Sequence, residues 1–523
     1  MAGWSGAVKL GDLDDFIAPS QSCVVSTRGT GAAGAPVKLA DDAMDVDGED
    51  GGTLQSAVRV RATARSRRGK GAAASAEAEP GPAPSDRTGA GAEAAPAPVK
   101  ISLHDCLACA GCITSAETVL LEHQSAAELR SVLAARERVV VVSVAPQARA
   151  SLASHFGITP RETFERLTGY FKTLGVRAVF DTTCSRDLTL LEAREEFVQR
   201  YRAAAASAST AGVPSPSGCS GPLPVIASAC PGWVCYAEKS HSHVLPHLST
   251  VKSPQQVMAT LVKRHVAPQL GVAPAQIYHV AVMPCYDKKL EASREDFRSP
   301  ADGSPETDCV LTAGEVLGML EEEGVPLTAV PPAPVDAALS SVDEATGELF
   351  GGVGGGSGGY IEAVFRHAAA ELFGRAVPPG PLQYRQLRNA DLREVTLEVD
   401  GAVVLRFCAA YGFRNIQNLV RQIKQGRSPY HYVEIMACPS GCLNGGGQVK
   451  APAGGALAAK QLLERVEAAY HAVAPRAPEQ SPAARRLYDE FVLGPPCSAN
   501  ARTLLHTQFH ARTTPAGVLV TSW

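Results

Sequence analysis

The chain has 523 residues, a net charge of -4 and an uneven distribution of glycine, proline and alanine. At about 150 residues per domain, this length allows roughly three domains. The small net charge excludes a general basic field for nucleic acid or an anionic membrane. The longest purely apolar run, around residues 139–142, is far shorter than the roughly 20 residues of a membrane-spanning helix. We therefore expect a soluble protein with no nucleic-acid or membrane partner.

The N-terminus predicts a cytosolic location. No charged segment followed by an apolar core is present, and the early acidic residues Asp12, Asp14 and Asp15 disfavour an organelle transit peptide. The 14 cysteines of a large intracellular chain are better explained as metal ligands and buried thiols than as a disulfide framework.

A segment at 1–30 precedes a low-complexity stretch at 31–98. This stretch has an acidic run, then a basic run, then a tract of alanine, glycine and proline. It cannot bury enough apolar surface to fold, so we predict a disordered insertion. We interpret its basic run as solvated linker charge, with a nuclear-import or nucleic-acid patch as the alternative.

From about residue 100 onward, short β-branched runs alternate with amphipathic helices, which indicates an α/β fold with mainly parallel sheets. The predicted strands are 139–144, 178–180, 223–227, 278–283, 309–311 and 432–436, with a hairpin at 392–409. The predicted helices are 147–156, 188–201, one ending at 323, 360–373 and 416–425. We expect the glycine-rich stretch 351–359 to form a turn or loop, because isolated glycines are a weak signal of phosphate binding.

Three cysteines, Cys106, Cys109 and Cys112, repeat at intervals of three. This spacing lets a loop place three thiolates around an iron-sulfur cubane, although no Cys-Pro follows as in bacterial ferredoxins. The fourth ligand must come from elsewhere, and Cys23 is the only upstream cysteine. A zinc site completed by His104 or His123 is the competing interpretation.

A second set of four cysteines, Cys230, Cys285, Cys438 and Cys442, predicts one 4Fe-4S cluster. Three of them directly follow predicted strands, and ligands of open α/β sheets bind beyond the carboxyl ends of the strands. Prolines stand beside these three, and glycines at 441 and 445–447 allow the backbone to approach a cluster closely. The six other cysteines are interpreted as ordinary buried thiols: Cys184, Cys219, Cys235, Cys309, Cys408 and Cys497.

The phrases around the second set resemble the iron-only (FeFe) hydrogenases, above all the string from Met436 to Gln448. A closer resemblance is to an offshoot of these enzymes, the Nar/Narf-like factors of cytosolic iron-sulfur assembly. It is carried by Leu13-Asp14-Asp15-Phe16-Ile17, by Lys100 to Cys109, by Ala227 to Glu238, by Ser253-Pro-Gln-Gln256 and by Leu504 to His510.

The resemblance implies a hydrogenase-like fold in which two α/β lobes surround a buried 4Fe-4S cluster, with a small N-terminal cluster-binding segment. It implies that Cys23, Cys106, Cys109 and Cys112 hold one cluster. It implies that Cys230, Cys285, Cys438 and Cys442 hold the other. The expected divisions after the insertion are a cluster segment at 99–135, lobes at 136–250 and 251–455, and a helical segment and tail at 456–523.

Ala229 argues against hydrogen chemistry. In the hydrogenases a cysteine stands at this place and passes protons to the iron pair, whereas a methyl group is neither acid nor base. In addition, the chain has cysteines for only one accessory cluster. We therefore expect no enzyme activity. A hydrogenase with an altered proton relay is one alternative, and a nuclear prelamin-binding protein of the Narf type is another. Lys288 either faces an iron site, as its hydrogenase counterpart does, or forms a salt bridge.

The family resemblance implies an adaptor that links the early scaffold to the late targeting complex, in the cytoplasm and with a nuclear pool left open. The chain ends in Trp523, and a terminal aromatic residue resembles the tail by which such proteins dock on the targeting complex. A carboxylate next to an indole is a compact anchor. Thr521 departs from the aliphatic residue usual there, so the match is partial.

Overall fold

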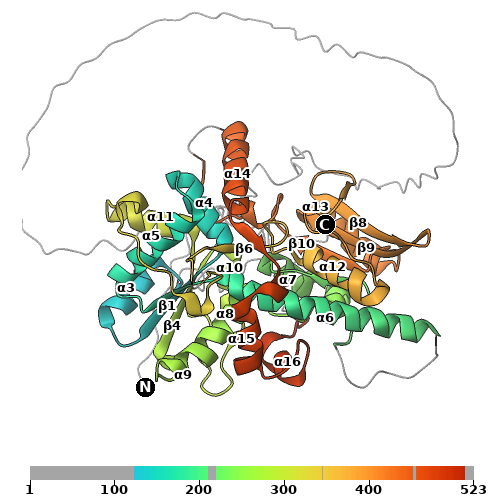
Figure 1. The fold of residues 1–523 in the computed structure, drawn as a ribbon, viewed down its shortest axis with the longest axis horizontal. Helices are drawn as coiled ribbons and strands as arrows, with labels where there is room; N and C mark the ends of the chain where they lie inside the picture. The colour runs from blue at the N-terminus through green and yellow to red at the C-terminus, as the bar shows by residue number, and fades with distance from the viewer. Residues whose placement is uncertain (1–122, 210–218, 344, 452–454, 513–523) are drawn as a thin grey trace, which may run out of the picture. The chain divides into compact units, whose positions relative to one another are not determined.

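Two large sheets and one short strand pair organise the part of the chain that the structure describes (Figure 1). The computed structural model describes residues 123–209, 219–343, 345–451 and 455–512. All of them belong to the second of two units into which the chain divides, Val99–Trp523. None of the described helices combines the length and apolarity that crossing a membrane requires.

The first sheet is parallel throughout. Its order is β2 (Ala178–Asp181), β1 (Val139–Val144), β4 (Ile277–Met283) and β5 (Cys309–Thr312). Side chains alternate across a strand, and both faces of β1 are buried: Val140, Val142 and Val144 enter one core and Val141 enters another. A parallel sheet covered on both faces gives such continuous β-branched runs.

Helices cover both faces of this sheet. One face packs against α3 (Ala126–Ala135), α4 (Pro146–Phe156), α5 (Pro160–Thr173) and α11 (Ala313–Glu322). The other packs against α6 (Thr182–Ser209) and α8 (Pro254–Leu261), followed by the short α9 (Ala267–Gln269). Helix α11 begins with a capping box, because the Thr312 hydroxyl accepts from the Glu315 N–H (3.2 Å) and the Glu315 carboxylate accepts from the Thr312 N–H (2.8 Å).

The second sheet is mixed. Its order is β3 (Val225–Ala227), β10 (Tyr432–Met436), β9 (Ala402–Tyr411), β8 (Leu392–Val399) and β7 (Arg385–Gln386). Strand β10 runs parallel to β3 and β9, whereas β9, β8 and β7 are antiparallel. Its core includes α7 (Pro231–Ser240), α12 (Tyr360–Phe373) and α13 (Phe413–Lys424).

The expected lobe boundary at residue 250 does not separate the two sheets. Strand β3, at 225–227, belongs to the second sheet, whereas β4 and β5, at 277–312, return to the first. Helix α6 joins the two halves, because Leu188 packs into the first-sheet core and Phe197 into the second. Each half is therefore assembled from separated pieces of the chain.

The C-terminal residues form helices α14 (Gly455–His471), α15 (Pro482–Leu487) and α16 (Ala499–Leu505). Strand β11 (Ala474–Arg476) pairs in parallel with β6 (Phe350–Gly352), so part of the expected glycine-rich turn is a strand. One more short helix, α10 (Asp287–Ala292), lies between β4 and β5 along the chain.

Most predicted elements are confirmed. Helix α12 and strand β10 have the predicted bounds, and the predicted hairpin is β8 and β9. Helix α6 is longer than predicted at both ends. Helices α5, α7 and α8 were not anticipated; each begins with a proline in its first turn.

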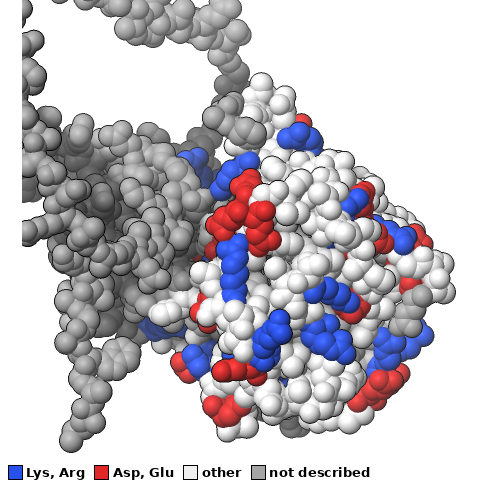
Figure 2. Space-filling model, turned by 90° about the vertical axis from the view of Figure 1, so that its left-hand side faces the viewer, with Lys and Arg blue, Asp and Glu red and all other residues white. Residues whose placement is uncertain are grey.

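Basic and acidic side chains are interspersed on the face shown in Figure 2. Many surface charges are paired locally, as in Arg161 with Glu165 (2.9 Å) and Arg130 with Glu322 (2.7 Å). Mixed charges of this kind give no field of one sign over that face.

Candidate metal centre

Three strand ends bring cysteines from both sheets to one place. Cys230 follows β3 and Cys438 follows β10, which are neighbours in the second sheet, and Cys285 follows β4 of the first sheet. Cys442 opens the single-turn helix η8 (Cys442–Asn444). Cys230 and Cys438 are buried, and Cys285 and Cys442 are half-buried. The strand-end arrangement expected from the sequence is therefore present.

The four thiols lie close enough to affect one another. Burial raises the pKa of all four, and for Cys285, Cys438 and Cys442 the charge of neighbouring cysteines raises it further. Four such groups cannot all be thiolates unless a positively charged centre compensates them. The donor set therefore fits a metal group that binds sulfur.

The number and kind of the donors fit an iron-sulfur cluster. A 4Fe-4S cubane takes one cysteine thiolate at each of its four irons. Four thiolates also suit a tetrahedral zinc ion.

Backbone and hydroxyl groups orient the cysteines. The Ala437 N–H donates to Cys230 Sγ at 3.4 Å, the kind of contact that stabilises a cluster thiolate. The Ser228 hydroxyl donates to the Ile435 carbonyl (2.6 Å) and accepts from the Cys230 N–H (3.1 Å), which ties β3 to β10. The Cys442 N–H donates to the Ser357 hydroxyl at 3.2 Å. Sequence reasoning missed both serines; the only signal for Ser357 was its place in a glycine run.

The glycines of the 445–447 run are packed against the Cys285 loop. The Gly447 N–H donates to the Pro284 carbonyl (2.9 Å), and the Gly447 carbonyl accepts from Gly314 (2.9 Å). A Cβ on Gly445 would lie 2.3 Å from the Pro284 oxygen, and one on Gly447 would lie 3.1 Å from Cys285 Cα. These positions therefore need glycine for close backbone approach.

Gly445→Ala should expel the Pro284 carbonyl from its place and shift the Cys285 loop. We expect a loss of about 1–3 kcal/mol in unfolding free energy from overpacking, with reduced iron content. Urea unfolding and iron analysis measure the two effects. Gly355→Ala is the matched control, because a Cβ there meets nothing within 4 Å. Equal effects of both substitutions would contradict the packing argument.

Lys288 forms a salt bridge. Its ammonium lies 2.8 Å from Glu291 Oε2 and 3.3 Å from the Ser253 hydroxyl, and the side chain is buried. Ser253 also caps α8, and Gln255 Nε2 donates to the Lys288 carbonyl (3.1 Å). The Ser253-Pro-Gln-Gln256 phrase therefore packs against the cysteine loop. The Lys288 charge also lowers the pKa of Cys285, against the larger effect of burial.

Ala229 packs at the edge of the second-sheet core. Its methyl group offers no proton donor or acceptor beside Cys230. The remaining expected site residues, Cys23, Cys106, Cys109, Cys112 and Trp523, lie outside the described residues, as do the 31–98 insertion and His104. The other proposed zinc partner, His123, is exposed.

Glu434 on β10 is buried behind the site. Its carboxylate accepts from the Ile361 N–H (3.2 Å) and from the Tyr411 hydroxyl. Burial raises the pKa of Glu434 to about 7, and the charge of Glu362 adds to the shift. Because the pKa of Glu434 is higher in the folded chain than in the unfolded chain, its protonated form stabilises the fold. This stabilisation is fully present below the pKa of the unfolded glutamate and is lost as the pH rises through 7.

Glu434→Gln should therefore gain stability over the wild type between pH 5.5 and pH 8. The difference should grow by up to about 1.4 kcal/mol per pH unit until Glu434 is fully ionised. Anaerobic urea unfolding at several pH values measures it. Glu398→Gln, at an exposed position of β8, controls for removal of a surface charge. A difference that shrinks with rising pH would have the wrong sign for a raised pKa.

Comparisons with known proteins agree with this geometry. Residues 138–446 match the family "Iron only hydrogenase large subunit, C-terminal domain", and residues 459–512 match "Iron hydrogenase small subunit". An FeFe-hydrogenase from Chlamydomonas reinhardtii has a similar structure, with a TM-score of 0.62 and 29% identity. That match covers 74% of this chain and 99% of the hydrogenase chain.

Curated relatives match over nearly the full length. "Cytosolic iron-sulfur assembly component 3" of Mus musculus is 48% identical over 531 residues, which is 99% of each chain. "Protein NAR1" of Arabidopsis thaliana is 45% identical over 518 residues, covering 97% of this chain and 96% of that protein. The zebrafish (Danio rerio) "Cytosolic Fe-S cluster assembly factor narfl" is 50% identical over 79% of this chain and 98% of its own.

Proposed function

The chain belongs to the Nar/Narf-like family of the iron-only hydrogenase fold, and from that premise we propose that it is a cytosolic iron-sulfur assembly factor with two 4Fe-4S clusters. The convergence of Cys230, Cys285, Cys438 and Cys442 at strand ends from both sheets carries the proposal. The near full-length identity to named assembly components supports the pathway.

The second cluster is proposed for Cys23, Cys106, Cys109 and Cys112. Support comes from the triple-cysteine spacing and from where the chain enters the described region. Gln124, 12 residues after Cys112, donates to the Lys289 carbonyl (2.9 Å) and accepts from the Val310 N–H (3.1 Å). These hydrogen bonds fix Gln124 beside α10, the helix that follows Cys285.

We further propose that the protein has no hydrogenase activity and acts as an adaptor between the early scaffold and the late targeting complex, docking through Trp523. Ala229 supports the first part, because it supplies no proton relay beside Cys230. The Trp523 indole supports the second, because a large aromatic side chain is a compact anchor.

Anaerobic iron and acid-labile sulfide analysis tests the cluster count. About eight irons per chain are expected, and Cys23→Ala should retain about four. A wild-type value near four would contradict the second site. Hydrogen evolution from a reduced dye after maturation, with infrared bands of iron-bound carbonyl and cyanide, would instead establish a hydrogenase.

A pull-down with the targeting complex tests the tail. The wild type should be retained and a chain lacking Trp523 should be lost from the complex, with unchanged iron content as the sign of an intact fold. Equal retention of both chains would remove Trp523 from the interface.

A further inference from the structure

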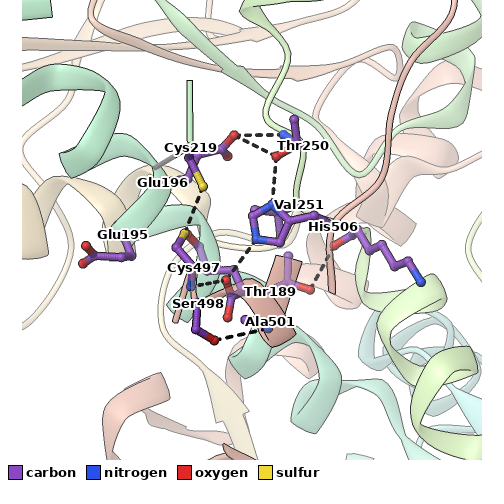
Figure 3. A network of polar contacts seen from close by, with 12 residues as sticks. Thr189, Glu195, Glu196, Cys219, Thr250, Val251, Cys497, Ser498, Ala501 and His506 are labelled. Atoms are coloured by element: carbon purple, nitrogen blue, oxygen red, sulfur yellow. Dashed lines mark hydrogen bonds and ion pairs between the residues drawn. The ribbon is translucent and has the colours of Figure 1, made fainter. Parts of the chain in front are cut away.

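Two cysteines with no motif of their own lie sulfur to sulfur away from the candidate metal centre. Cys219 precedes β3 and Cys497 precedes α16, yet their Sγ atoms are 3.2 Å apart across 278 residues of sequence (Figure 3). Their exposed fractions are 8% and 4%. Both are buried thiols, as the sequence predicts, and the structure adds that they lie next to each other.

The backbone fixes both residues. The Cys219 N–H donates to the Gln199 amide oxygen (2.9 Å), and the Cys497 N–H donates to Glu192 Oε2 (2.7 Å). Cys497 has a φ of 58°, in the left-handed region that residues with a side chain rarely adopt. A backbone held there indicates that the sulfur contact is imposed by the surrounding fold.

His506 lies beside the pair, and both of its ring nitrogens are occupied. Nδ1 is 2.8 Å from the Thr250 hydroxyl (Figure 3). Nε2 is 3.0 Å from Glu192 Oε2. Burial lowers the pKa of His506, but the hydrogen bond to Glu192 and the nearby glutamate charges outweigh it and raise the pKa. In its protonated form the ring has no lone pair for a metal, although two thiols and an imidazole meet within 4.8 Å.

The two sulfurs are unequal. The contact with the Cys497 thiol lowers the pKa of Cys219 despite burial, and the His506 charge acts in the same direction. The same contact raises the pKa of Cys497. Cys219 is therefore the better nucleophile, with Cys497 as its adjacent thiol, which is the arrangement of a reactive cysteine and its resolving partner.

We propose that Cys219 and Cys497 form a redox-active dithiol that closes reversibly to a disulfide. A disulfide bond of about 2.05 Å needs the sulfurs to approach by roughly 1.2 Å. The co-reactants are a peroxide as oxidant and a small or protein dithiol as reductant.

The chemistry balances in two steps. The Cys219 thiolate attacks hydrogen peroxide, forming a sulfenic acid and releasing hydroxide; the Cys497 thiol then attacks that sulfur, forming the S–S bond and releasing water. Two electrons pass from the thiols to the peroxide. A reducing dithiol returns two electrons and two protons by thiol–disulfide exchange and is itself oxidised to a disulfide.

The surroundings of the pair provide a path for the oxidant and contain two chain segments that the disulfide would join. A cavity of about 570 Å³, lined in part by Tyr488, Pro495 and Pro496, reaches the residues just before Cys497. The Tyr488 hydroxyl donates to Glu192, the residue that holds Cys497. Closure would covalently fasten the segment before α16 to the segment before β3.

Peptide mapping of the full-length protein tests the proposal. The anaerobically purified chain is titrated with hydrogen peroxide, alkylated and digested. A cross-linked peptide pair containing Cys219 and Cys497 should form while Cys184, a fully buried lone cysteine, stays alkylatable after unfolding. A reducing dithiol should abolish the cross-link. Mapping by residue separates this pair from any oxidised cluster ligands.

Variants assign the roles. In Cys497→Ser, a sulfenic acid should be trapped at Cys219 by a dimedone probe, whereas Cys219→Ser should leave Cys497 unmodified. His506→Gln should slow closure about tenfold, because it removes a positive charge that stabilises the Cys219 thiolate. If Cys219 and Cys497 were no more sensitive to peroxide than Cys184, and all three were recovered as free thiols, the proposal would be overturned. So would one bound zinc per chain that Cys497→Ser releases.

Discussion

Cys438→Ala should remove about four irons per chain and leave the remaining cluster in place, because a 4Fe-4S cubane needs a thiolate at each of its four irons. Cys438 is the ligand best placed for this test. It is buried, it directly follows β10, and its pKa is raised by burial and by all three of the other cysteines. Iron and acid-labile sulfide analysis measures the loss, and the visible absorbance of the cluster should fall in proportion.

The matched control is Cys408→Ala. Cys408 is also buried, on β9, and pairs in register with Val433 of β10, but no cysteine contributes to its raised pKa. It should keep its full iron content while losing some stability from the small cavity. If Cys438→Ala kept its iron, or if Cys408→Ala lost the same amount, the four-cysteine site would be wrong.

The sequence predicted the strand ends well because the signals there are local. Val139–Val144 is a β-branched run bounded by Arg138 and by Ala145-Pro146, and Tyr432–Met436 is followed by Ala437-Cys438. A cysteine just after such a run lies at the carboxyl end of its strand, whichever sheet the strand joins. The grouping of Cys230, Cys285 and Cys438 therefore did not require the topology to be known.

The division into sheets could not be predicted in the same way. Strand β3 has only three residues, and its partner β10 lies some 200 residues further along the chain. Helices α6 and α12 pack against each other in the core that contains both strands. A pairing over that distance leaves no mark on the local pattern. The expected lobes at 136–250 and 251–455 followed chain order, whereas the fold exchanges strands between its halves.

Polar residues that orient the site were missed for a related reason. Ser228 and Ser357 are ordinary in sequence and gain their roles through contacts with Ile435 and Cys442, which are remote along the chain. The same holds for Cys219 and Cys497. Neither has a spacing motif, and only the fold brings their sulfurs together.

Glu238→Gln should lower the unfolding free energy by about 3 kcal/mol, since it leaves a buried arginine without its main partner. The Glu238 side chain is fully buried on α7 and accepts two hydrogen bonds of 2.8 Å from Arg294. Arg294 keeps Asp296 as a second partner at 2.8 Å, so the expected loss is at the lower end for a broken buried pair. Anaerobic urea unfolding, with iron content checked beforehand, measures the change.

The same carboxylate also anchors the chain beyond α16. Glu238 accepts from the His510 N–H (3.0 Å) and lies 3.3 Å from the Arg512 guanidinium, so it joins α7, the segment after α10 and residues 510–512. The variant should therefore be cleaved faster by limited proteolysis after Leu505. Glu479→Gln breaks a more exposed pair, with Arg194 at 3.0 Å, and should cost under about 1 kcal/mol with no change in cleavage. Equal losses for the two variants would mean that Glu238 contributes no more than an exposed surface charge.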